Sequence, residues 1–101
     1  MPLKKDDKEL LARVNEVLFY IWDPIGVVAF GPSARDEYDS YALQVFGLLK
    51  KRSASEEIAN FLNKITVDRM GLSSNIKHDT ETAILLLNWM DFLETRGHKI
   101  N

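Results

Sequence analysis

The densest group of chemically capable side chains lies in the stretch RDEYDSY, residues 35–41. Asp36 and Asp39 are three residues apart, so a helix would place both carboxylates on one face. Paired carboxylates can bind Mg²⁺ or act as general acid and base. Acid–base catalysis also needs environments that separate the two pKa values, and nothing on this polar side of the segment indicates burial. We therefore interpret the segment as a solvated first helical turn in which Arg35 pairs with Asp39. A metal-dependent enzyme that uses Asp36 and Asp39 is the alternative.

Apolar residues beside this acidic pair indicate a different use of the same segment. Leu43 and Phe46 follow at helical spacing but lie off the main apolar stripe, although Phe46 could equally belong to the core. Acidic groups that steer a partner and apolar groups that anchor it are typical of protein-binding surfaces. We predict a partner-binding surface formed by Asp36, Asp39, Leu43 and Phe46, with Phe30 as a further candidate in the preceding loop.

Other catalytic or metal-binding signatures are weak. His78 stands near Asp79 and Glu81, but it has no second histidine three or four residues away on a helix face. Asp79 is better explained as a helix N-cap. The chain has no cysteine, which excludes disulfides and cysteine nucleophiles. It also lacks the phosphate-binding glycine motifs and the G-x-S-x-G motif, so we predict neither a cofactor nor a metal site nor catalysis.

Composition and charge are those of one soluble globular domain, residues 1–101. Hydrophobic residues make up 46% and charged residues 28%, and the net charge is −2. The basic clusters at residues 4–5 and 50–52 are small and lack interleaved aromatic residues, which argues against nucleic-acid binding. No apolar run approaches the length of a membrane span, and the N-terminal residues lack the apolar core of a secretory signal. We expect a cytoplasmic protein.

Four segments have the three-and-four spacing of amphipathic helices, and none alternates with period two over a strand's length. The predicted fold is therefore all-α, a compact bundle of about four helices with an irregular loop between the first two. The helices are expected at about Asp7–Trp22, Ala34–Lys51, Ser55–Met70 and Asp79–Glu94. The predicted N-caps are Asp6 or Asp7, Ser33, Ser53 or Ser55, and Asp79, and Gly71 is the predicted stop of the third helix.

The predicted core follows the apolar stripes of these helices. Tyr38 and Tyr41 lie on the stripe of the second helix, so each hydroxyl needs a partner if buried. Arg69 falls on the buried stripe of the third helix, and we expect it to pair with Asp23 or, failing that, with Asp36. The fourth helix is apolar nearly all round, which places it at the centre of the bundle or at a subunit interface. The remaining predicted core residues are Leu10, Val14, Val17, Leu18, Ile21, Ala42, Val45, Leu48, Leu49, Ile58, Phe61, Leu62 and Ile65.

The stretch WDPIGV, residues 22–27, is predicted to be a structural corner rather than a ligand cradle. Pro24 stops the helix because the residue before a proline is pushed out of the α conformation. Gly26 is expected to allow the chain to turn. Ile25 is expected to fill part of the core, and Trp22 to pack against the corner. Asp23 is expected to hold the corner by accepting hydrogen bonds from the start of the second helix or from Arg69.

The blocks VNEVLFYIWDPIGV, ARDEYDSY, SEEIANFL and RMGL, within residues 14–72, resemble small bacterial all-helical proteins with a W-DPIG…DEYDSY signature. The resemblance implies no catalytic residues. It implies instead an immunity protein of a polymorphic-toxin or contact-dependent inhibition system. Such a protein would neutralise a cognate toxin, with a nuclease as the expected class. A self-associating structural or regulatory helical protein, forming a homodimer through the fourth helix, is the alternative.

Overall fold

The described part of the chain forms four helices, two of which end in a wider π-helical turn. The computed structural model describes residues 4–23 and 35–97, without the side chains of residues 35–37 and 96–97. In the described residues there is no strand, so the all-α fold is confirmed. The helices are α1 (Lys5–Val17, continued by the π-helical turn Leu18–Trp22), α2 (Arg35–Lys50), α3 (Ser55–Lys64, continued by the π-helical turn Ile65–Arg69) and α4 (Ile76–Gly97). Pro24, Gly26, Phe30 and the predicted irregular loop lie outside the described residues.

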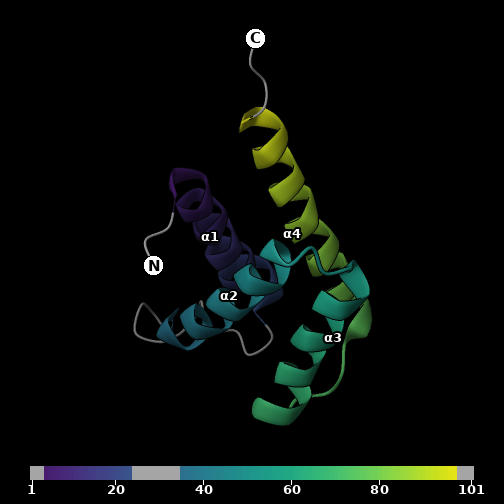
Figure 1. Cartoon of the computed structure of the whole chain (residues 1–101). Helices are drawn as coiled ribbons and strands as arrows, with labels where there is room; N and C mark the ends of the chain where they lie inside the picture. The colour runs from purple at the N-terminus through teal and green to yellow at the C-terminus, as the bar shows by residue number, and fades with distance from the viewer. Residues whose placement is uncertain (1–3, 24–34, 98–101) are drawn as a thin grey trace.

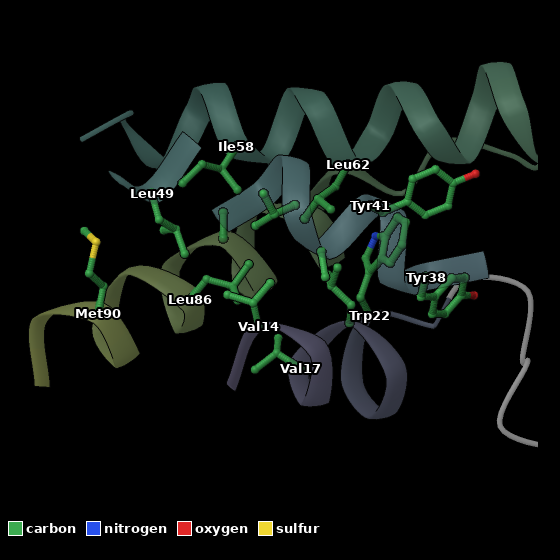
Figure 2. Packing of buried hydrophobic residues seen from close by; sticks show 14 of the residues in the cluster. Val14, Val17, Trp22, Tyr38, Tyr41, Leu49, Ile58, Leu62, Leu86 and Met90 are labelled. Atoms are coloured by element: carbon green, nitrogen blue, oxygen red, sulfur yellow. The ribbon is translucent and has the colours of Figure 1, made fainter. Parts of the chain in front are cut away.

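The helices pack around α4 and α1. The chain reverses between α3 and α4, which lie side by side, while α1 packs against both α2 and α4 (Figure 1). Their apolar stripes meet in one core, and Figure 2 shows its residues converging from all four helices. Within the described residues α4 contacts each of the other three helices and places one face in the core. The buried apolar residues are Leu10, Val14, Val17, Leu18, Phe19, Trp22, Tyr38, Tyr41, Ala42, Val45, Leu49, Ile58, Ala59, Leu62, Ile65, Ala83, Leu86, Met90 and Leu93.

Departures from the predicted core cluster at the π-helical turns. Ile21 was expected in the core but is 48% exposed, while Phe19 is buried. Arg69 was expected on the buried stripe of α3 and is exposed. Hydrogen bonds in a π-helix close over five residues instead of four, so side chains past the start of each turn leave the 3.6-residue period on which the prediction rested. Leu48 and Phe61, by contrast, are half-buried at the edge of the core.

Helix starts differ from the predicted caps. α1 begins after Lys4 and α3 after Ala54, in both cases without a side-chain capping bond. The fourth helix begins three residues earlier than expected, because Asn75 caps it: its Oδ1 accepts from the N–H of His78 at 3.3 Å. Asp79 therefore lies inside the first turn of α4 and is buried. The Ser33 cap lies outside the described residues.

The helix ends use left-handed residues. Gly71 has a φ of 66°, and the N–H of Leu72 donates to the carbonyl of Thr66, so Gly71 stops α3 as predicted. At the end of α2 the same conformation falls on Arg52, with a φ of 64°. The N–H groups of Arg52 and Ser53 donate to the carbonyls of Leu49 and Leu48, the pattern of a Schellman C-cap.

Candidate protein-binding surface

A polar cluster joins the end of α1 to the start of α4. The indole Nε1 of buried Trp22 donates to Oδ1 of Asp79 at 2.9 Å. The Nε2 atom of His78 lies 3.0 Å from the carbonyl oxygen of Ile21 and 3.1 Å from that of Trp22. The last carbonyls of a helix have no intrahelical donor, so an Nε2–H on His78 satisfies acceptors that would otherwise face water. The cluster therefore fastens two helix ends that are more than fifty residues apart in the sequence.

Asp79 has one property of a catalytic carboxyl. Burial raises its pKa, although the hydrogen bond from Trp22 and the charge of His78 act in the opposite direction. Its Oδ2 atom has no hydrogen-bond partner among the described residues. Yet Asp79 is only 2% exposed, which leaves a substrate no direct access to the carboxyl. Structural networks also perturb pKa values, and we assign Asp79 to the packing of α1 against α4.

Asp23 holds the end of α1 in a conformation that is unusual for a residue with a side chain. Its φ is 24°, and its N–H donates to the carbonyl of Leu18. Its Oδ1 accepts from the hydroxyl of Tyr38, in the first turns of α2, at 3.0 Å. The start of α2 was one of the two predicted sources of donors to Asp23. The other, Arg69, makes no hydrogen bond or ion pair within the described residues, because its π-helical turn carries it to the surface.

The aromatic residues of the corner and of α2 pack together. The ring centroids of Trp22 and Tyr38 are 5.4 Å apart, and the ring of Tyr41 meets Trp22 edge-on at 6.3 Å (Figure 2). All three rings are buried. Tyr38 and Tyr41 therefore lie in the core, as their positions on the apolar stripe of α2 predicted.

The predicted partner-binding surface on α2 is only partly described. Asp39 is exposed, and Leu43, one turn further along α2, is 58% exposed. Phe46 is half-buried and packs against the core, so only part of its side chain is accessible to a partner. The side chain of Asp36 and the whole of Phe30 lie outside the described residues. The described part of this surface thus consists of one carboxylate beside one apolar side chain.

A second surface lies on α4, and we call it the α4 hollow. It is a shallow depression of about 300 Å³ lined by Leu85, Asn88, Trp89 and Phe92. The rings of Trp89 and Phe92 meet edge to face at 5.8 Å, and Phe92 is 55% exposed. From α1, the guanidinium of Arg13 lies 5.7 Å from the centroid of the Trp89 ring.

The α4 hollow was not among the site residues predicted from the sequence. The sequence feature that could have indicated it is the apolar circumference of the fourth helix, since such a helix was expected either at the centre of the bundle or at an interface. In the structure one face of α4 lies in the core and Phe92 lies outside it. A one-dimensional pattern cannot divide such a helix into an inner and an outer face.

Across residues 4–23 and 35–97, no three His, Asp or Glu side chains come together in a way that could hold a metal ion. No helix in these ranges is long and apolar enough to cross a membrane. The chain matches no protein-family model, no curated protein and no solved structure.

Proposed function

We propose that this protein acts by binding another protein and has no catalytic activity of its own. The observation that carries the proposal is the α4 hollow, where half-buried Trp89 and exposed Phe92 form an aromatic pair beside Arg13. Tryptophan and arginine are enriched among the residues that dominate binding energies at protein interfaces. An apolar hollow rimmed by polar residues also suits a protein ligand better than a small polar substrate.

The specific version of the proposal is an immunity protein that neutralises a cognate bacterial toxin in the cytoplasm. Its support is the resemblance of the W-DPIG…DEYDSY blocks, residues 22–41, to such proteins. A nuclease is the expected toxin class, and nucleases commonly present basic surfaces to their substrate. Asp39 on α2, beside exposed Leu43, would then steer association while apolar contacts slow dissociation.

Two surfaces are therefore candidates, and matched substitutions distinguish them. Phe92→Asp tests the α4 hollow, Leu43→Asp tests the α2 surface, and Val67→Asp is the control at an exposed apolar position on the α3 side. All three side chains are largely outside the core, so the variants should keep the circular dichroism of the parent protein. The partner to be tested is the product of the adjacent gene, co-expressed and co-purified with each variant.

We expect Phe92→Asp to weaken binding by at least about tenfold, chiefly through faster dissociation, because a charge enters an apolar contact. The same variant should lose protection in a growth assay with the co-expressed toxin, while Val67→Asp retains it. Loss of protection with Leu43→Asp alone would move the partner surface to α2. A dimer of the parent protein that dissociates in Phe92→Asp, with no binding of the neighbouring gene product, would replace the immunity proposal with self-association.

A further inference from the structure

A second cavity, separate from the α4 hollow, lies between α2 and the end of α3. It has a volume of about 250 Å³. Phe61 and Ile65 supply apolar lining from α3 and its π-helical turn, and Tyr41 and Gln44 line it from α2. This volume lies below the roughly 300–1,000 Å³ of pockets that bury drug-sized ligands. The cavity therefore suits a compact molecule with an apolar part.

Charges of both signs line the same cavity without neutralising one another. Lys64, Asp68 and Arg69 are exposed lining residues, and none of the three forms an ion pair with a described residue. Elsewhere the chain pairs such groups closely, with 2.8 Å between Lys50 Nζ and Asp7 Oδ1. The π-helical turn Ile65–Arg69 contributes Asp68 and Arg69 to the lining, and π-helical turns recur at functional sites.

The hydroxyl of Tyr41 adds a neutral donor and acceptor. The ring of Tyr41 is buried against Trp22, but its hydroxyl points away from the apolar cluster (Figure 2). Within the described residues it makes no hydrogen bond, whereas the hydroxyl of Tyr38 donates to Asp23. Because Tyr41 lines the cavity, its hydroxyl can donate to a ligand there.

We propose that this cavity binds a free α-amino acid with an apolar side chain. The ligand carboxylate meets Arg69 and Lys64, with the Tyr41 hydroxyl as a further donor. Its ammonium meets Asp68, and its side chain packs on Phe61. A simple anion would leave Asp68 facing negative charge, and a simple cation would face Arg69 and Lys64. A zwitterion matches all three charges, and the inference is independent of the protein-binding proposal.

Isothermal titration calorimetry of the full chain tests the assignment. The probes are L-leucine, L-methionine, L-phenylalanine and L-tryptophan, compared with 3-phenylpropionate, which lacks the ammonium, and phenethylamine, which lacks the carboxylate. At least one amino acid should bind with one-to-one stoichiometry and a dissociation constant of about 1 mM or tighter, which usual ligand efficiencies allow for this size. 3-Phenylpropionate and phenethylamine should each bind at least about tenfold more weakly than phenylalanine, or not at all. Each lacks one of the two charged groups and so leaves charge in the cavity unmatched.

Substitutions at exposed positions locate the binding. Arg69→Gln and Asp68→Asn should each weaken binding of the best amino acid by about tenfold or more, since each removes one charged contact. Lys77→Gln, at an exposed lysine outside the cavity, is the control and should leave the affinity unchanged. The proposal is overturned if none of the four amino acids binds, or if 3-phenylpropionate binds as tightly as phenylalanine. Equal binding by Arg69→Gln and the parent protein would overturn it as well.

Discussion

The indole Nε1 of Trp22, the last residue of the α1 π-helical turn, donates to the buried carboxyl of Asp79 in the first turn of α4. The donor and acceptor are 57 residues apart in the sequence, and both are buried. Removing either partner strands the other in a site without water contact, which typically costs about 1–3 kcal/mol. The stability of the bundle should therefore depend on this pair and on the protonation of its carboxyl.

The first prediction follows from the raised pKa of Asp79. The native carboxyl keeps its proton to higher pH than the unfolded one, whose ordinary pKa is 3.8. Between these two pKa values the native state binds more protons, so this group's contribution to stability falls as pH rises and levels off above the folded pKa. Asp79→Asn removes that contribution. Urea titrations at about pH 3.5, 5 and 7 should show the free energy of unfolding of the parent protein falling, relative to Asp79→Asn, as pH rises. Asp91→Asn, at an exposed site on the same helix, is the control. A constant difference between parent and Asp79→Asn at all three pH values would contradict the prediction.

The second prediction concerns Asp23 and Tyr38. Asp23→Ala removes the acceptor of the Tyr38 hydroxyl and should lower the free energy of unfolding by about 1–3 kcal/mol. Tyr38→Phe keeps the buried ring and loses only the hydroxyl, so about 1 kcal/mol is expected. Tyr41→Phe is the matched control, because the Tyr41 hydroxyl has no hydrogen bond within the described residues. Urea midpoints of the three variants measure these differences. An unchanged midpoint for Asp23→Ala would show that the corner does not depend on its carboxylate.

The third prediction compares the effect on stability of an alanine at Gly47 with that of an alanine at Gly71. A methyl group added at Gly47 or at Gly71 meets no atom within 4 Å, so sterics with neighbours do not distinguish the two sites. Gly47 lies inside α2, where alanine is favoured by about 0.5–1 kcal/mol. Gly71 has a φ of 66°, where a Cβ costs about 1–2 kcal/mol. Thermal denaturation should therefore give a higher midpoint for Gly47→Ala and a lower one for Gly71→Ala. Shifts of the same sign would contradict the assignment of Gly71 as a left-handed helix stop.

The fourth prediction concerns Arg52, which combines a left-handed backbone with a salt bridge. Its two terminal nitrogens each lie 2.8 Å from an oxygen of Glu94, and this hydrogen bonding raises the pKa of Arg52. Arg52→Ala should be less stable than Arg52→Gly, since both lose Glu94 but only glycine relieves the backbone. Denaturation midpoints measured at low and high salt check both parts. The difference in midpoint between Arg52→Ala and Arg52→Gly should persist in high salt. High salt screens the salt bridge to Glu94, which only the parent protein has, so the midpoint of Arg52→Gly should rise relative to that of the parent. Equal stability of the two variants would contradict the backbone assignment.

Hydrophobic periodicity alone determined the all-α fold, the four helices and most of the core, because a stripe at 3.6-residue spacing must be buried in any bundle that these helices form. It also placed Tyr38 and Tyr41 in the core, while the glycine at position 71 predicted a helix end. These are local properties: each depends on residues within one or two helical turns. The end of each helix was predicted less well where the period changes, as at Ile21 and Arg69, because a π-helical turn has no distinct sequence pattern.

Tertiary structure decided which polar residues meet and which apolar residues stay outside. The neighbours of Asp79 in the sequence predicted that it caps a helix. Instead its carboxyl accepts a hydrogen bond from Trp22, at the end of a helix distant in the sequence, and Asn75 is the cap. The sequence likewise marked α4 as apolar nearly all round, and only the packing of α1 and α3 against it separated buried Leu86 from exposed Phe92. Such outcomes depend on the relative placement of whole helices, and spacing along one helix carries no information about the side on which its neighbours will lie.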